Sequence, residues 1–187
     1  MFLSAFIGVY LRLITVFPIL DMGSKTGFWL ALSVLIVVLD QATKFVIAQY
    51  FTTLKTVVVT PFFNLVLVYN PGAAFSFLSD AAGWQRGLFI SIALIASAWI
   101  VYLLRKYPQQ RLFALALSLV LAGAVGNVID RVLFGAVVDF IQLHAYGFYW
   151  PAFNVADSAI SCGAVLLVWD ALRPRSKTGP TAETQRR

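Results

Sequence analysis

The chain consists of long apolar runs separated by shorter polar or mixed segments. Four of the runs are long enough for membrane-spanning helices, and they cover residues 28–48, 87–104, 112–129 and 155–172. A helix needs about 20 mainly apolar residues to cross roughly 30 Å of hydrocarbon. The pattern therefore predicts a mainly α membrane protein, a four-helix transmembrane bundle that forms one domain over residues 27–172.

The segment 51–80, between the first two apolar runs, has a different pattern. Its stretches LKTVVV and FFNLVLVY are rich in β-branched and aromatic residues but are too short to span a membrane as helices. The tripeptide Asn70-Pro71-Gly72 is a turn signal, and small residues after it allow another backbone to approach closely. We therefore predict a small β-rich segment that lies at the outer membrane surface.

The two ends of the chain fit the bundle less well. Residues 1–26 form an N-terminal extension that is apolar but interrupted by Arg12 and Pro18. Three interpretations stay open for it: an interfacial helix, a weak extra span, or sequence upstream of a true start at Met22. Residues 173–187 form a basic, polar tail, which we expect to be disordered and cytoplasmic.

The composition supports a membrane protein. Hydrophobic residues make up 60% of the chain, charged residues only 12%, and the mean hydropathy is +0.85, whereas a soluble domain carries about 25% charged residues. The net charge of +6 could suggest nucleic acid, but the basic residues flank the predicted spans and fill the tail. The positive-inside rule then predicts that both termini are cytoplasmic and that segment 51–80 lies outside.

Cysteine and histidine are too few to suggest a metal or a disulfide. Cys162 is the single cysteine and His144 the single histidine. One cysteine cannot form an intrachain disulfide, and a catalytic zinc takes about three protein ligands. We expect no metal and no cofactor.

Polar side chains from distant parts of the sequence are predicted to gather at the outer end of the bundle. They come from the outer ends of spans one, three and four and from both outer segments: Asp40, Asn70, Asn127, Asp130, Arg131, Asp139, Asn154 and Asp157. Such convergence at one membrane depth is typical of a functional site.

Asp139 and Asp157 flank an aromatic stretch, punctuated by Gly and Pro, that we expect to be a loop. Two carboxyls close together in a poorly solvated place cannot both ionise easily, so one keeps its proton while the other acts as a base. Such a pair can activate water for attack on an amide carbonyl. Structural alternatives stay open: Asp157 capping a helix, and Asp139 facing water on a loop.

Two further charged pairs have both a structural and a functional interpretation. Asp40 and Lys44 are four residues apart, share one helix face and can form an ion pair. That pair either orients the helix or lines a polar site. Asp130 and Arg131 could similarly form an interfacial ion pair, while Arg131 could instead bind a carbonyl oxygen.

Five short motifs follow one another along the chain: DQATK at 40–44, NPGAAFS at 70–76, GNVIDR at 126–131, VDF at 138–140 and FNVADS at 153–158. Together they resemble the bacterial lipoprotein signal peptidases (signal peptidase II), an aspartyl peptidase family, over roughly residues 27–172. The resemblance implies a four-span enzyme of the bacterial inner membrane. It implies removal of signal peptides from prolipoproteins, with cleavage on the amino side of a cysteine that carries diacylglycerol.

The resemblance also implies roles for individual residues. Asp139 and Asp157 correspond to the catalytic pair. The residues expected to support the site or bind substrate are Asp40, Lys44, Asn70, Gly72, Asn127, Arg131 and Asn154. The implied partners are diacylglyceryl-modified prolipoproteins and membrane lipid, with the active site near the periplasmic face; we expect no nucleic acid and a monomer.

Two other classes of function are alternatives to a peptidase. A small proton- or ion-coupled transporter would carry acids near the membrane midplane and interrupted spans, whereas here spans two to four are apolar at their centres. A structural membrane subunit would use its polar residues only to pack helices. Separate Asp139→Asn and Asp157→Asn changes discriminate these classes from a peptidase.

Overall fold

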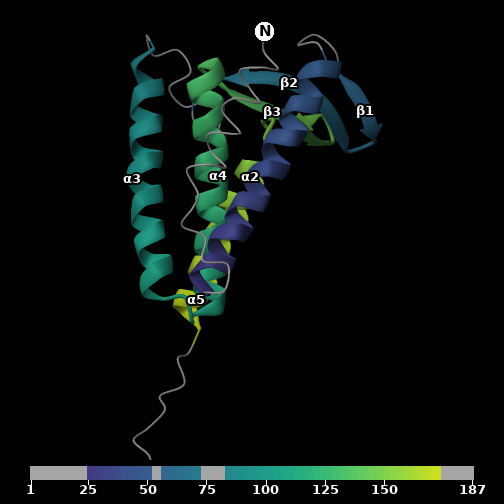
Figure 1. The fold of residues 1–187 in the computed structure, drawn as a ribbon. Helices are drawn as coiled ribbons and strands as arrows, with labels where there is room; N and C mark the ends of the chain where they lie inside the picture. Colours follow the sequence, from purple (N-terminus) through teal and green to yellow (C-terminus); the bar gives the residue numbers. More distant parts are fainter. Residues whose placement is uncertain (1–24, 52–55, 73–82, 174–187) are drawn as a thin grey trace, which may run out of the picture.

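The computed structural model describes residues 25–51, 56–72 and 83–173. Its elements, in chain order, are α2 (Lys25–Tyr50), β1 (Val57–Thr60), β2 (Phe63–Asn70), α3 (Trp84–Lys106), α4 (Arg111–Phe134), β3 (Val137–Ala145), β4 (Phe148–Tyr149) and α5 (Val155–Leu172). The helices lie alongside one another, and the sheet sits at one end of them (Figure 1). The expectations for residues 1–24 and 174–187 fall outside the described residues.

Four of the described helices, α2 to α5, are long and apolar enough to cross a membrane. Each predicted span falls within one of them, and α5 has the predicted bounds. The predicted class, a mainly α membrane protein with a small β-rich part, is confirmed.

Helix α4 is the centre of the bundle, and small residues allow its neighbours to approach it closely. A methyl group at Gly123 would lie 2.3 Å from the carbonyl oxygen of Ala156, and one at Gly163 would lie 2.7 Å from the carbonyl oxygen of Ala116. Backbone therefore packs on backbone between α4 and α5. The small residues of segment 122–126 are thus part of a helix-packing surface.

The bundle is closed by apolar packing at the end away from the sheet. Leu30 of α2, Leu104 of α3 and Leu117 of α4 belong to one buried cluster. The Trp29 indole donates a hydrogen bond to the carbonyl oxygen of Pro108, at a distance of 3.0 Å, in the turn between α3 and α4. This end of the bundle is thus held together mainly by apolar packing.

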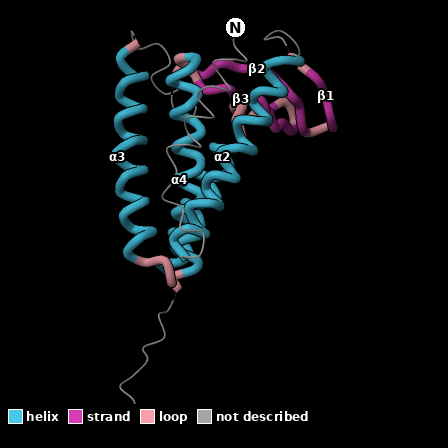
Figure 2. Tube along the Cα trace, in the orientation of Figure 1, coloured by secondary structure: helices cyan, strands magenta, loops and turns pink. Residues whose placement is uncertain are grey.

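The strands form one antiparallel sheet in the order β1-β2-β3-β4. Figure 2 shows the strands at the end of α2 and α4. Apolar side chains attach the sheet there, since Leu67 of β2 and Val138 and Phe140 of β3 share a buried cluster with Ile47 of α2. The sheet is therefore docked on the helices by one of its faces.

The expectation that Asp139 arrives on a loop is wrong. Asp139 and the first part of the aromatic stretch belong to β3, VVDFIQLHA, which pairs with β2 and places Val68 opposite Asp139. Its β-branched and aromatic side chains favour a strand, and Gly147, with φ of 81°, supplies the left-handed backbone that turns β3 into β4. Asp139 thus occupies a fixed register position in a sheet.

Replacing Gly123 by alanine tests the close packing of α4 on α5. The added methyl overlaps the Ala156 carbonyl oxygen and lies 2.5 Å from Cγ1 of Ile160, so we expect a loss of about 1–3 kcal/mol in the free energy of unfolding. Gly87→Ala on α3 is the matched control, because nothing lies within 4 Å of its added methyl. Unfolding in detergent micelles measures both; equal stability of the two variants would contradict the packing.

Candidate active site

Asp139 and Asp157 reach the site from different elements at the sheet end of the bundle. Asp139 lies in β3 and is 2% exposed. Asp157 lies in the first turn of α5 and is half-buried. An acidic residue in that turn is favourably placed near the unpaired N–H groups of a helix start. One carboxyl is therefore enclosed and the other is partly accessible.

Asn154 connects the two acids through both ends of its amide group. It is the N-cap of α5, and its Oδ1 accepts a hydrogen bond from the backbone N–H of Asp157 at 2.8 Å. Because that bond fixes which end of the amide is oxygen, Nδ2 must point the other way. It donates to Oδ1 of Asp139 at 2.7 Å and to the carbonyl oxygen of Val138 at 3.2 Å.

Two further amides are oriented by the same logic. Oδ1 of Asn127 accepts from Nζ of Lys44 at 3.2 Å, so its Nδ2 donates to Oδ1 of Asp157 at 2.7 Å. Oδ1 of Asn70 accepts from the backbone N–H of Gly72 at 3.0 Å, and its Nδ2 donates to Oδ2 of Asp139 at 3.1 Å. Both oxygens of Asp139 therefore accept hydrogen bonds from amides of fixed orientation.

The surroundings raise the pKa of Asp139 from 3.8 to about 7. Burial is the largest cause, since it disfavours the charged form, and repulsion from Asp157 adds to it. The hydrogen bonds from Asn70 and Asn154 oppose the shift but do not cancel it. Near neutral pH, Asp139 therefore readily holds a proton.

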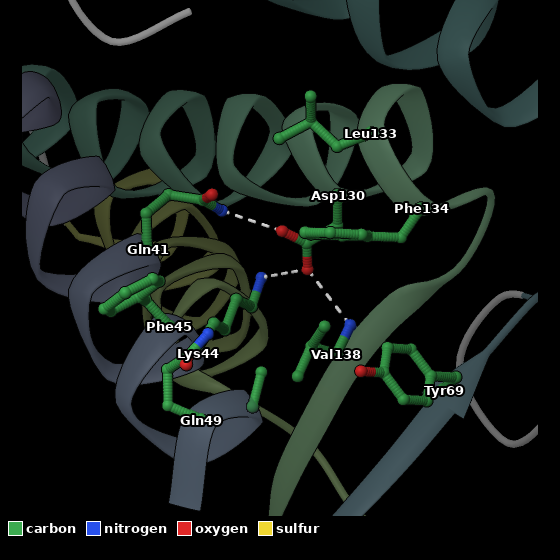
Figure 3. Close-up of a pocket in the computed structure, with 10 residues that line it drawn as sticks. Gln41, Lys44, Phe45, Gln49, Tyr69, Asp130, Leu133, Phe134 and Val138 are labelled. Atoms are coloured by element: carbon green, nitrogen blue, oxygen red, sulfur yellow. Dashed lines mark hydrogen bonds and ion pairs between the residues drawn. The ribbon is translucent and has the colours of Figure 1, made fainter. Parts of the chain in front are cut away.

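Lys44 lies at the centre of a buried ionic cluster next to these acids. Its Nζ is 2.8 Å from Oδ2 of Asp40 and 2.8 Å from Oδ2 of Asp130, which confirms the predicted Asp40–Lys44 pair. The bond to Asn127 occupies the third ammonium hydrogen. Figure 3 shows the Lys44 ammonium and the Asp130 carboxylate between α2 and β3.

The two carboxylates of this cluster also hold backbone groups at the site. Oδ1 of Asp40 accepts from the backbone N–H of Ala156 at 2.8 Å, at the start of α5. Oδ2 of Asp130 accepts from the backbone N–H of Val138 at 3.0 Å, next to Asp139 (Figure 3). The ion pairs therefore set the positions of both segments that carry the acids.

The alternative of an Asp130–Arg131 ion pair is wrong, because Asp130 pairs with Lys44. Arg131 instead donates from Nη2 to the carbonyl oxygen of Gly72 at 2.8 Å, and its guanidinium carbon lies 5.1 Å from the centre of the Phe89 ring. The two neighbours point into different parts of the site, as expected for successive residues of a helix.

The alternative that Asp157 caps α5 with its side chain is also not observed; Asn154 is the cap.

The structure connects all the predicted site residues by hydrogen bonds or ion pairs. Asp130, expected among the polar residues at the outer end of the bundle, belongs to the ionic cluster, whereas Gln41, another member, was not predicted as a site residue. Gln41 donates to Asp130 and Asp40 at 2.8 and 3.1 Å. A polar amide inside an apolar span needs such partners, and that signal could have identified it.

Within the described ranges, no group of three His, Cys, Asp or Glu side chains could hold a metal ion. The chemistry available to the arrangement is that of the two carboxyls, the amides around them and Arg131. A carboxyl pair that shares one proton at near-neutral pH can act as general acid and general base together.

Removing the Lys44 ammonium tests the ionic cluster. Lys44→Met leaves Asp40 and Asp130 buried without a cation, so we expect a loss of about 3–5 kcal/mol in the free energy of unfolding. Adding Asp40→Asn and Asp130→Asn to Lys44→Met should restore part of that loss, because no buried charge then remains in the cluster. Detergent-phase unfolding measures each variant; additive losses would contradict the ion pairing.

The raised pKa of Asp139 predicts a pH-dependent stability. Between pH 3.8 and about 7 the folded protein holds the Asp139 proton and the unfolded chain does not. Proton binding by Asp139 therefore stabilises the folded protein at low pH, and this stabilisation is lost as the pH rises through that window. Relative to Asp139→Asn, the wild type should lose up to about 1.4 kcal/mol per pH unit there. Unfolding titrations of both proteins measure this, and parallel pH curves would contradict it.

Comparisons with known proteins agree with this architecture. The sequence model of the family described as signal peptidase (SPase) II matches residues 32–173. A lipoprotein signal peptidase of Cupriavidus necator is 58% identical over 145 residues, which cover 78% of this chain and 83% of that protein. The lipoprotein signal peptidase of Paraburkholderia phymatum is 50% identical over 151 residues, which cover 81% of this chain and 91% of that protein.

A solved structure also resembles this fold. A bacterial membrane enzyme determined at 2.3 Å by the in meso method superposes with a TM-score of 0.70 and 36% sequence identity, covering 81% of this chain and 93% of that one. Sequence and fold therefore lead to the same result: the chain belongs to the signal peptidase II family.

Proposed function

We propose that Asp139 and Asp157 are the catalytic pair of this enzyme. Membership of the family makes the chain a membrane peptidase that removes signal peptides from prolipoproteins. The assignment of the reaction to these two carboxyls rests on one observation: amides of fixed orientation connect Asp139 to Asp157 through Asn154 and Asn127. No other pair of acids in the described residues shares such a connection without a neutralising lysine.

The two acids have different environments, which suggests a division of roles. Asp157 is the more accessible carboxylate and takes a proton from a water molecule as that water attacks the scissile carbonyl carbon. Asp139, whose pKa is raised to about 7, holds the proton that is transferred to the departing amide nitrogen. After the C–N bond breaks, the proton taken up by Asp157 restores the shared proton of the pair.

Arg131 and the turn that contains Asn70 and Gly72 are positioned to bind the substrate backbone. The guanidinium holds Gly72 through its carbonyl oxygen, while Asn70 in the same turn contacts Asp139. The Nε of Arg131 is buried and has no hydrogen-bond partner among the described residues. An unpaired buried donor is costly, and a substrate carbonyl oxygen would satisfy it.

The location of the site suits a lipid-modified substrate. The acids lie at the sheet end of four apolar helices, and the sheet carries exposed aromatic side chains such as Phe148 and Tyr149 in β4. Aromatic residues favour the membrane interface. A prolipoprotein whose cysteine carries diacylglycerol would keep its acyl chains in the bilayer and present the bond on the amino side of that cysteine at this depth.

The charge distribution supports one orientation in the bacterial inner membrane. The end of the bundle away from the sheet carries Lys25, Arg105, Lys106, Arg111 and Arg173. The positive-inside rule places this end in the cytoplasm, together with both termini, and the acids near the periplasmic face.

Separate Asp139→Asn and Asp157→Asn variants test the catalytic pair. Each removes one carboxyl while keeping its shape, so we expect cleavage of a diacylglyceryl-modified peptide to fall about 1000-fold or more, as for loss of a general acid or base. The assay uses folded protein in detergent, with kcat and KM determined separately. We expect the loss in kcat.

The matched control is Asp170→Asn in the last turn of the same helix, which should cleave at the wild-type rate. Near-normal cleavage by either Asp139→Asn or Asp157→Asn would overturn the assignment. A similar loss in all three variants would show that the assay reports stability rather than catalysis.

A further inference from the structure

A cavity lies on the other side of β3 from Asp139. It has a volume of about 400 Å³ and opens between α2, α4 and the sheet, and Val138 and Tyr69 line it (Figure 3). These two residues are paired across β3 and β2. Successive residues of a strand point to opposite faces, so Val138 faces this cavity while Asp139 faces Asn70 and Asn154 on the other side. Strand β3 therefore separates the cavity from the proposed reaction.

The polar lining of the cavity is the ionic cluster. Gln41, Lys44 and Asp130 line it and are nearly inaccessible, with exposures of 1%, 3% and 0%. They are buried polar groups at the inner end of an otherwise apolar space formed by Phe45, Leu133 and Phe134 (Figure 3). The cavity therefore has a polar floor and apolar walls.

The hydrogen-bond donors of this floor are already used inside the protein. The ammonium of Lys44 donates to Asp40, Asp130 and Asn127. The two amide hydrogens of Gln41 are shared among three acceptors: Asp40, Asp130 and the carbonyl oxygen of Gly126. Because a carboxylate oxygen can accept more than one hydrogen bond, the remaining capacity of the floor is that of an acceptor. A ligand there must bring donors.

The charge of the floor also favours a cation. Asp40 and Asp130 share the single ammonium of Lys44. Including the catalytic pair and Arg131 does not balance the charge, since the four acids then face two cations. If the catalytic pair holds one proton, three negative charges still face two positive charges. An excess negative charge buried among apolar helices is costly. A cationic ligand in the cavity would lower that cost.

The opening of the cavity lies where the polar part of a lipid resides. Gln49, at the end of α2, is exposed, and Tyr69 on the sheet is 44% exposed. Both residues line the cavity and carry donors for a phosphate oxygen. Helix ends at the membrane boundary lie at headgroup depth. The ligand chemistry is thus an amine deep in the cavity, a phosphate at the opening, and acyl chains outside.

We propose that this cavity binds the protonated amine of a phosphatidylethanolamine-type phospholipid, at a site separate from the catalytic pair. The ammonium donates to the Asp130 carboxylate and adds the positive charge that the ionic cluster lacks. Through Lys44 and Asn127 the bound headgroup supports the network that reaches Asp157.

Lipid titration of the full chain tests the site. Delipidated protein in a neutral detergent is titrated with short-chain phosphatidylethanolamine, the matched phosphatidylcholine, N-acetylated phosphatidylethanolamine and phosphatidylglycerol, and bound lipid is counted by native mass spectrometry. The primary ammonium supplies charge and N–H donors together, so we expect it to bind about tenfold more tightly than the other three. Equal binding of all four lipids would overturn the proposal.

Variants assign the binding to this cavity. Ala48→Phe fills the space beside the lining residues, and Gln49→Leu removes a donor at the opening while changing only an exposed side chain. Each should weaken phosphatidylethanolamine binding about tenfold or more, whereas Val46→Phe, on an exposed position of the same helix, should not. Selective binding that survives both cavity variants would place the lipid elsewhere and overturn the site.

Discussion

The rest of the site depends on the ion pairs that the Lys44 ammonium forms with Asp40 and Asp130. Two carboxylates are buried in an apolar bundle only because this cation lies 2.8 Å from each. Those carboxylates then hold the first turn of α5 and the start of β3 through backbone N–H groups. Both segments carry a proposed catalytic acid, so the ion pairs of Lys44 help to set where the two acids lie.

The same cluster shows why the packing around it must be tight. A methyl group at Gly126 would lie 2.6 Å from Oδ2 of Asp40 and 3.3 Å from Cβ of Ala156. The absence of a side chain there allows α2 and α5 to reach α4 at one level, where the Asp40 carboxylate enters between them. Small residues thus serve the ionic cluster as well as the helix contacts.

The sequence predicted the helices well because each span is a long apolar run, a signal that does not depend on tertiary contacts. It also indicated which polar residues gather, since charged groups in an apolar bundle must meet partners. Which charged groups form ion pairs with one another was less predictable. An ion pair between Asp130 and its sequence neighbour Arg131 was one open interpretation, but the fold brings Lys44 to Asp130 from α2. The strand that carries Asp139 was missed because its pairing with β2 joins segments far apart in the chain.

Asn154 performs two tasks with one amide, since its oxygen starts α5 and its nitrogen holds Asp139. The beginning of the last helix and the placement of the buried acid are consequently a single structural event. The tip of the β3–β4 hairpin, where Tyr146 is fully exposed, takes no part in it. That tip is therefore a natural attachment point for a fluorophore or an affinity tag, from which the depth of the enzyme in a bilayer could be followed while its chemistry continues undisturbed.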